Sequence, residues 1–333
     1  MGANTEISWC HHTVNFWWGC TFARYLSGDV REECEHCYAL MLSKLFSRGK
    51  ATWGTNGNRW IRHEAARREL YKLDRKAFER GVRERVFINS MSDTFEDREE
   101  LNEARGFLWD ACKFTTNLDI LLLTKRPANV LRMVPPAWLT NWPEHVWIGT
   151  TAGTQKAADE NVPALIEIPA RVRFLSCEPL LGPVDVEEYL EDMCDGGYVL
   201  GSAPIHWVIC GGESGGGARP MHPDWARSLR DQCAAAGVAF HFKQWGEWAP
   251  AAAHLNPYDP AKPHEYENRC TWISTGATVG VTENTRQCNL TTPERPAHSF
   301  EDGEVLAFRV GKKSAGRLLD GVEHNAFPQE GVP

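Results

Sequence analysis

The chain has 333 residues, 42% of them hydrophobic and 24% charged, a composition typical of a soluble globular protein that can bury a large core. The formal net charge of −8 is no general signature for nucleic acid, so only a local basic patch is compatible with such a partner. No apolar run reaches the roughly 18 residues of a membrane span. The first residues show no leader pattern, so we expect a cytoplasmic protein without membrane contact whose eleven cysteines are reduced.

Short apolar segments alternate with helical patterns along most of the chain. The predicted strands are Thr13–Trp17, Arg85–Ser90, Asp119–Lys125, His145–Thr150, Arg171–Cys177, Ile205–Gly211 and Val238–Gln244. The predicted helices are Cys34–Arg48, Ile61–Arg80, Leu101–Lys113 and Pro223–Ala236. The strands are mostly apolar, as expected for parallel strands covered on both faces. We therefore predict an α/β fold, a TIM-like partial or full (β/α) barrel with parallel strands.

Three regions are expected along the chain. Residues 1–248 form the barrel-like domain, which includes an N-terminal cysteine loop. Residues 249–300 are rich in Pro, Asn and Thr and have little periodicity, which predicts an irregular insertion or lid. Residues 301–333 contain a predicted strand and helix at Val305–Leu319, followed by a tail.

The most informative motif comprises Cys20, Cys34 and Cys37, with the spacing C-x13-C-x2-C. Three thiolates can hold three irons of a cubane iron–sulfur cluster and leave the fourth iron open. They can instead hold zinc if a histidine completes the site, and His11, His12 and His36 are near in the sequence. Buried core cysteines are a third possibility, which the charged residues around Cys34 and Cys37 oppose.

Polar or glycine residues follow six of the predicted strands. In parallel βα folds, ligands bind at the carboxyl ends of the strands. These residues are Asn89–Asp93, Thr124–Pro127, Gly149–Thr151, Ser176–Pro179, Gly211–Gly217 and Lys243–Trp245. We expect them to share one pocket.

The glycine-rich segment Gly211–Gly217 has two functional interpretations beside that of a plain flexible turn. Its backbone N–H groups can bind an anion, and Glu213 can accept a hydrogen bond from a ligand ammonium. It also contains the letters of a hydrolase nucleophile elbow around Ser214, with Asp224 and His241 downstream. An elbow needs a helix directly after the serine, and here that helix starts only near Pro223.

The segment Arg59–Arg85 holds eight Arg and two Lys against five acidic residues. Such a helix can contact a phosphate backbone, with Trp53 and Trp60 stacking on bases. The simpler interpretation is a solvated helix face with pairs such as Glu64–Arg68.

Several longer motifs extend over most of the chain. They are Ile7–Trp9, Gly19-Cys20, Cys34–Ala39, Ser90–Asp93, Leu123–Pro127, Phe174–Pro183, Gly211–Gly215, Arg219–Met221, Phe242–Gly246 and Gly311–Lys313. Together they resemble a phage- and prophage-associated family of uncharacterised proteins. That family carries a three-cysteine motif and is regarded as similar to radical S-adenosylmethionine enzymes.

The resemblance implies a TIM-like partial barrel with a 4Fe–4S cluster on Cys20, Cys34 and Cys37, whose open iron binds S-adenosylmethionine. Reductive cleavage, which needs an electron donor, would give a 5′-deoxyadenosyl radical that abstracts a hydrogen atom. By the same resemblance, the residues that hold the methionine part are Ser90 and Asp93, or Gly211, Gly212, Glu213 and Ser214.

The same resemblance implies that Lys125, Arg126 and Glu178 contact the substrate, with catalytic roles for Lys125 and Glu178. The expected substrate is a nucleic-acid base or nucleotide. The alternative is a nucleic-acid-binding or accessory protein with a structural zinc site. A hydrolase that uses Ser214 ranks third.

Overall fold

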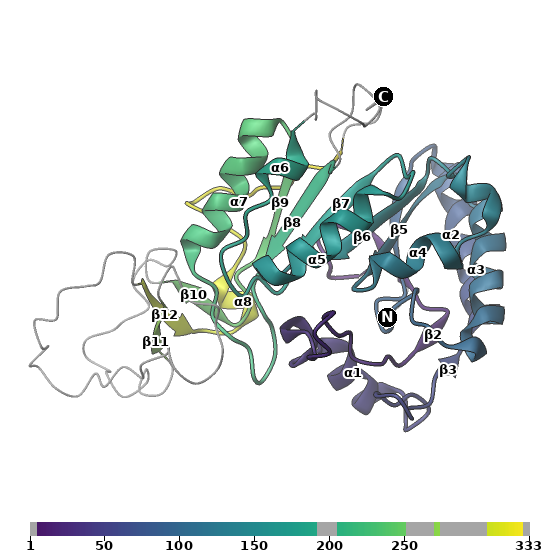
Figure 1. Cartoon of the computed structure of the whole chain (residues 1–333), viewed down its shortest axis with the longest axis horizontal. Helices are drawn as coiled ribbons and strands as arrows, with labels where there is room; N and C mark the ends of the chain where they lie inside the picture. The colour runs from purple at the N-terminus through teal and green to yellow at the C-terminus, as the bar shows by residue number, and fades with distance from the viewer. Residues whose placement is uncertain (1–4, 192–204, 251–269, 274–304, 329–333) are drawn as a thin grey trace, which may run out of the picture.

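The computed structural model describes residues 5–191, 205–250, 270–273 and 305–328. Seven strands form one sheet in the order β1-β4-β5-β6-β7-β8-β9, and all six neighbouring pairs are parallel. The sheet curls into a half-barrel (Figure 1), which confirms the predicted TIM-like partial barrel. The strands are β1 (His12–Val14), β4 (Glu84–Ile88), β5 (Leu118–Thr124), β6 (Val146–Thr151), β7 (Arg173–Cys177), β8 (Trp207–Gly211) and β9 (Ala239–Gln244).

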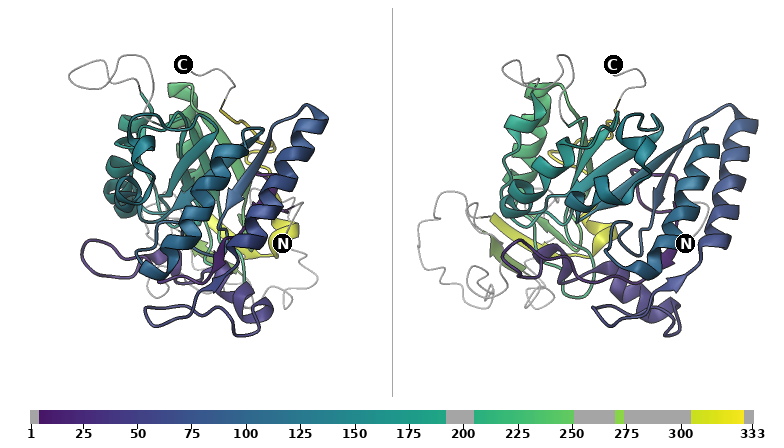
Figure 2. Two further views of the ribbon diagram at one scale, coloured as in Figure 1. Left: turned by 90° about the vertical axis from the view of Figure 1, so that its right-hand side faces the viewer. Right: turned by 45° about the vertical axis from the view of Figure 1, so that its right-hand side comes forward.

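Helices cover the outer face of the sheet (Figure 2). They are α2 (His63–Arg80), α3 (Asn102–Phe114), α4 (Val130–Met133), α5 (Gln155–Ile166), α6 (Glu187–Leu190) and α7 (Pro223–Ala236). Apolar side chains of alternate strand positions, such as Ile120, Leu122 and Val208, pack against these helices in the largest core cluster. The parallel strands therefore bury this face under helices, as the sequence predicts.

Helix α7 has the same bounds as its prediction, because its termini are marked in the sequence. Pro223 occupies the first turn, and the His222 side chain accepts a hydrogen bond from the Asp224 N–H at 3.1 Å. Gly237 ends the helix in the left-handed region, with φ 68°. Helix α5 is not among the predicted helices, because Pro163 is unusual inside a helix.

The predicted helix Cys34–Arg48 is shorter in the structure, where α1 spans Tyr38–Phe46. Residues Glu32–Cys34 form a separate 3₁₀ turn, and Cys37 stands at the N-cap of α1. Cys34 therefore belongs to the 3₁₀ turn and Cys37 to the start of α1. These two adjoining elements fix the positions of the two cysteines relative to each other.

An aromatic core fills the concave face of the half-barrel. Phe87, Trp147, Phe174 and Trp207 project from the strands, and Trp9 from the N-terminal segment packs among them. Phe327 from the C-terminal segment also contacts this cluster, with its ring centroid 5.2 Å from that of Trp207. The two terminal segments therefore cover the face that the missing half of a closed barrel would cover.

The C-terminal segment also protects one edge of the sheet. Phe242 of β9 donates its N–H to His324 O at 2.9 Å, and Ala326 donates to Phe240 O at 3.2 Å. Exposed strand edges are sites of unwanted pairing, and these bonds occupy the edge of β9.

The tryptophans near strand ends differ in burial. Trp17, Trp18 and Trp245 are buried, whereas Trp53, Trp60 and Trp248 are only partly buried. Two small sheets complete the fold. One pairs β2 (Trp17–Trp18) with β3 (Trp60–Ile61), and the other contains β10 (Trp248–Pro250), β12 (Val305–Arg309) and β11 (Cys270–Ile273).

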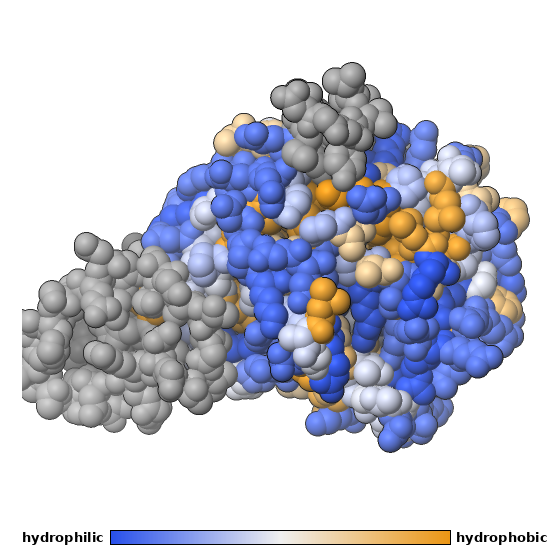
Figure 3. All heavy atoms as spheres, in the orientation of Figure 1, coloured by the Kyte–Doolittle hydropathy of each residue, from blue (hydrophilic) through white to orange (hydrophobic). Residues whose placement is uncertain are grey.

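The predicted strand and helix in Val305–Leu319 are present as β12 and α8 (Lys312–Ala315). Most of the expected excursion at 249–300 lies outside the described residues. Polar residues dominate the face in Figure 3, and apolar residues show mainly between the helices. In the part of the chain described, no helix is both long and apolar enough to cross a membrane.

Candidate cysteine-lined site at the carboxyl edge

Cys20, Cys34 and Cys37 come together at the carboxyl edge of the sheet. Cys20 follows β2, Cys34 ends the 3₁₀ turn and Cys37 begins α1, and all three are free thiols. Burial raises the pKa of the Cys20 thiol to about 12, and the charge of Cys34 contributes to that rise. Burial also raises the pKa of Cys34, with a contribution from Cys37. The three sulfurs are therefore electrostatic neighbours.

A buried ion pair holds the loop that carries Cys20. Arg59 donates to both carboxylate oxygens of Glu96, at 2.9 and 2.6 Å, and both side chains are almost fully buried. Glu96 also accepts the Thr21 N–H at 2.8 Å. Gly19 before the cysteine has φ 101°, and a Cβ there would lie 2.9 Å from Asn58 O, so that only glycine fits this close approach.

Arg126 connects the end of β5 to the Cys20 loop. Its guanidinium donates to Asp93 Oδ2 at 2.7 Å, to the Cys20 sulfur at 3.8 Å and to Thr21 O. Asp93 also accepts from the Thr124 hydroxyl at 2.7 Å. Burial alone would raise the pKa of Asp93, but the Arg126 charge and these hydrogen bonds outweigh it and lower the pKa. Both carboxylate oxygens of Asp93 already accept hydrogen bonds. Asp93 therefore positions the end of β5 and, through Arg126, the Cys20 loop.

Lys125 is the cation associated with the thiols. Burial alone would lower the pKa of its ammonium, but Cys34, Glu33 and Cys37 outweigh burial and raise that pKa. Its ammonium makes no hydrogen bond or ion pair with any residue of the described ranges. Glu33 is buried, and its Oε2 has no partner in the described structure. The site thus contains a cation with no direct hydrogen bond or ion pair in the described structure, beside Cys34 and Cys37.

Glu213 and Arg219 join the glycine-rich segment to the cysteine loop. Arg219 donates to Glu213 Oε1 at 2.7 Å and to Oε2 at 2.9 Å, with both side chains buried. It also donates to Glu35 at 2.8 Å and to Glu32 O at 2.9 Å. The His36 ring lies 3.1 Å from Glu213 Oε2. Because both oxygens of Glu213 are occupied, this carboxylate positions the cysteine loop and is not free for a ligand ammonium.

Glu178 lies at the end of β7 in a second polar cluster. Its Oε1 is 2.9 Å from the Lys243 ammonium, and its Oε2 accepts from the Trp9 indole at 3.2 Å. A Cβ at Gly211 would lie 2.7 Å from Glu178 Oε1. A Cβ at Gly153 would lie 2.2 Å from Pro179 O and 2.9 Å from Glu33 Cγ, so the segment after Glu178 passes close to the residue before Cys34.

The other expected cofactor-binding residues have structural partners. The Ser90 hydroxyl lies 3.3 Å from the Asn15 amide nitrogen, and the Ser90 carbonyl accepts from the Tyr38 hydroxyl at 2.7 Å. Gly212 passes the backbone of Trp245 so closely that a Cβ would lie 1.9 Å from its carbonyl oxygen. These residues hold adjacent strand ends together.

Ser214 does not have the surroundings of a hydrolase nucleophile. Its hydroxyl accepts a hydrogen bond from the Gln244 amide at 2.8 Å, whereas His241 pairs with Ser8 at 2.9 Å. Asp224 pairs with Arg227 in α7. The elbow interpretation is therefore wrong, because the three residues face different partners.

The arrangement of possible metal ligands bears on the choice of metal. Within the described ranges, no group of three or more His, Cys, Asp and Glu side chains is arranged to hold one metal ion. His11 accepts from the Arg85 N–H at 2.8 Å, and His12 pairs with Glu84 at 3.0 Å. Both histidines thus lie at the amino edge, opposite the cysteines, because β1 and β4 run in parallel.

Sequence reasoning identified Cys20, Cys34, Cys37, Lys125 and Glu178, which the structure brings to one edge of the sheet. It missed the roles of Arg59 and Glu96. Arg59 had been included in a basic helix, whereas Glu96 continues the polar run after β4. The polar residues after β4 are the signal that could have indicated a buried acid in addition to Asp93.

A parallel half-barrel with three thiols at its carboxyl edge defines the class of this protein. The profile described as "Protein of unknown function (DUF5131)" matches residues 4–328, and the chain belongs to this family. No curated protein and no solved structure gives a significant match. The description of the family gives no activity and mentions neither phage nor S-adenosylmethionine.

Proposed function

We propose that the protein is a radical S-adenosylmethionine-type iron–sulfur enzyme whose cluster is held by Cys20, Cys34 and Cys37. The observation that carries this proposal is the meeting of three free thiols from separate elements, with Arg126 at Cys20 and Lys125 beside Cys34 and Cys37. They meet at the edge where parallel βα folds bind their ligands.

The donor set fits a cluster better than a single zinc ion. Thiolates on one zinc, each about 2.3 Å from the metal, lie about 3.8 Å apart. Each cysteine that holds a cubane cluster binds a different iron. The cysteine sulfurs around a cluster therefore lie farther apart than those around one zinc ion. Zinc would need a fourth ligand, but His11 and His12 lie at the opposite edge of the sheet and the His36 ring pairs with Glu213. When bound, such a cluster supplies the electron for reductive cleavage of S-adenosylmethionine, and an electron donor is then required as a partner.

Two cations offset part of the cost of burying thiolates at this site. Arg126 donates to the Cys20 sulfur, and Lys125 brings a second positive charge to Cys34 and Cys37. Cys34 is only 7% exposed, so the protein also excludes water from this ligand. Since Asp93 and Glu213 are already occupied, Lys125 is our candidate for binding an anionic group of the cofactor or substrate.

The substrate class is a nucleic-acid base or nucleotide. This choice follows from the resemblance to a phage-associated family, and one surface feature supports it. The partly exposed ring of Trp60 lies under two cations, with Lys50 Nζ 5.1 Å and Arg62 Cζ 5.0 Å from its centroid. Exposed aromatic and basic residues of this kind bind single-stranded bases and phosphates.

Metal content after anaerobic purification tests the proposal. We expect about four irons and four sulfides per chain, which are lost in Cys34→Ala/Cys37→Ala and retained in the control Cys233→Ala. One zinc and no iron would overturn the cluster and favour the accessory zinc protein. With the cluster present, S-adenosylmethionine and dithionite should give 5′-deoxyadenosine. Absence of that product would overturn the radical reaction.

A further inference from the structure

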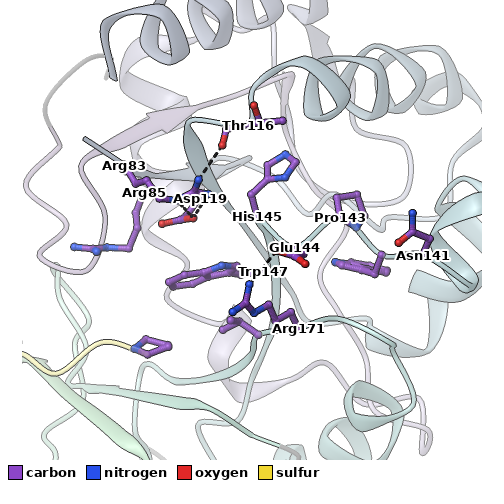
Figure 4. Close-up of a pocket in the computed structure, with 13 residues that line it drawn as sticks. Arg83, Arg85, Thr116, Asp119, Asn141, Pro143, Glu144, His145, Trp147 and Arg171 are labelled. Atoms are coloured by element: carbon purple, nitrogen blue, oxygen red, sulfur yellow. Dashed lines mark hydrogen bonds and ion pairs between the residues drawn. The ribbon is translucent and has the colours of Figure 1, made fainter. Parts of the chain in front are cut away.

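A cavity of about 670 Å³ opens at the amino edge of the half-barrel, opposite the cysteines. Its walls come from the starts of β4 to β7 and from the C-terminal segment, and it shares no residue with the cysteine site. Figure 4 shows Trp147 near the middle of the lining residues, with Arg85 to one side and Arg171 to the other. The volume lies within the roughly 300–1,000 Å³ of small-molecule sites.

The charges of this cavity do not cancel. Arg83 pairs with Asp119 at 2.7 Å, and Arg171 pairs with Glu144 at 3.0 Å. Arg85 has no acidic partner within hydrogen-bonding distance in the described structure. One positive charge therefore remains on the cavity wall.

The guanidinium of Arg85 is fixed in place but keeps donors available. Its Nε donates to Trp9 O at 3.2 Å, and its carbon lies 3.7 Å from the centroid of the Phe327 ring. The two terminal nitrogens donate to no residue of the described ranges. Burial lowers the pKa of Arg85, as expected for a cation whose charge is incompletely compensated. A guanidinium fixed in this way can bind a carboxylate or phosphate through two parallel hydrogen bonds.

Two further side chains define what else the ligand should carry. Trp147 is only 8% exposed, and its indole N–H has no hydrogen-bond partner among the described residues. His145 Nε2 lies 2.8 Å from Cys112 O, which can only accept, so Nε2 carries the proton. Burial lowers the pKa of His145, so the ring is neutral and its Nδ1 is an acceptor. The cavity thus offers donors for an anion and an acceptor for a ligand hydroxyl or N–H.

We propose that this cavity binds a small ring-bearing organic anion, with its carboxylate or phosphate on Arg85 and Trp147. Indole and proline surfaces of Trp142, Pro143 and Trp147 line the space beside these donors and suit a flat ring. This site is independent of the cysteines and of the proposed radical reaction.

Isothermal titration of the full chain tests this site with four probes: AMP, benzoate, inorganic phosphate and neutral adenosine. We expect saturable one-to-one binding of AMP or benzoate, with adenosine and phosphate at least about tenfold weaker because each lacks one of the two recognised features. If AMP binds tightly and benzoate weakly, the anionic group that the cavity recognises is a phosphate. If benzoate binds more tightly than AMP, it is a carboxylate.

Variants locate the binding. Arg85→Gln should weaken it at least about tenfold, and Trp147→Phe, which keeps an aromatic side chain but removes the indole N–H, about threefold or more. The control Arg75→Gln changes an exposed arginine on α2 and should have no effect. Binding should persist in Cys34→Ala/Cys37→Ala, which separates this site from the cysteine site.

Three results would overturn the proposal: no saturable binding of either organic anion, equal binding of adenosine, or unchanged affinity in Trp147→Phe. The last result decides the question even if Arg85→Gln fails to fold, because the phenylalanine variant keeps an aromatic side chain in the core.

Discussion

At the scale of single residues, close packing decides which positions tolerate change. Gly149 of β6 pairs with Phe174 of β7, and a Cβ at Gly149 would lie 2.4 Å from the phenylalanine ring. The glycine therefore leaves the space that the ring fills in the aromatic core. Glu96 is a second position that should not tolerate change, because its carboxylate compensates the charge of the buried Arg59.

Gly149→Ala should lower the free energy of unfolding by about 1–3 kcal/mol, because Phe174 must leave its position in a packed core. Urea denaturation measures this change. The control Gly106→Ala lies on the exposed face of α3 with no atom within 4 Å of the new Cβ, and it should stabilise by up to about 1 kcal/mol. Equal behaviour of the two variants would contradict the packing argument.

Glu96→Gln should cost about 3–5 kcal/mol, because it leaves the Arg59 charge buried without compensation. The neighbouring Asp97→Asn breaks an exposed pair with Arg132 and should cost about 0–1 kcal/mol. Denaturation curves of both variants give the comparison. A cost below 1 kcal/mol for Glu96→Gln would show that the pair does not hold the Cys20 loop.

At the scale of elements, Arg219 couples three parts of the chain. It links the loop after β8 to the 3₁₀ turn at Cys34 and to Glu35 before α1. The His36 ring, 3.1 Å from Glu213, adds a second contact between the cysteine loop and the glycine-rich segment. Its order therefore depends on a side chain from more than 180 residues away, since Arg219 and Glu35 are separated by 184 positions.

Arg219→Gln should raise the rate of Cys34 alkylation by iodoacetamide in the metal-free chain at least about tenfold. The reason is that a loss of about 1.4 kcal/mol in loop closure changes the open population tenfold. Peptide mass spectrometry measures the modification. Arg227→Gln, which breaks exposed pairs on α7, should leave the rate unchanged. An equal rise in both variants would indicate general loosening.

At the scale of the whole molecule, the half-barrel depends on its terminal segments. Ser8 bonds to His241 at 2.9 Å, and Trp207 donates to Ala326 O at 3.0 Å. His241 is buried, and burial lowers its pKa to about 3 from a usual 6.5. The histidine therefore stays neutral in the folded chain at pH values where it is protonated in the unfolded chain.

Stability should fall with pH between about 6.5 and 3, because the unfolded chain binds a proton that folded His241 does not. The contribution is at most about 1.4 kcal/mol per pH unit. His241→Gln should reduce this slope in denaturation curves recorded across the window. Part of the slope should remain, since burial also lowers the pKa of His206, to about 4. An unchanged slope in the variant would assign acid sensitivity elsewhere.

The sequence by itself determined the fold class, with its parallel strands, and the bounds of α7. Apolar runs, a proline in the first helical turn and a C-terminal glycine are local signals, and these are present in the letters of the chain. It also located the three cysteines, whose chemistry depends on residue type. Parallel topology then brings Lys125 and Glu178 to the same edge, as predicted from the ends of their strands.

Only the tertiary structure decided which polar residues have partners. Asp93 and Glu213 have the residue type of ligand-binding acids, but Arg126 and Arg219 occupy them. The cavity at Arg85 was likewise invisible, because its walls come from four strands and the C-terminal segment. Pairing between charges depends on distances of a few ångströms between residues far apart in sequence. Local patterns carry no information on those distances, which the packing of the whole chain determines.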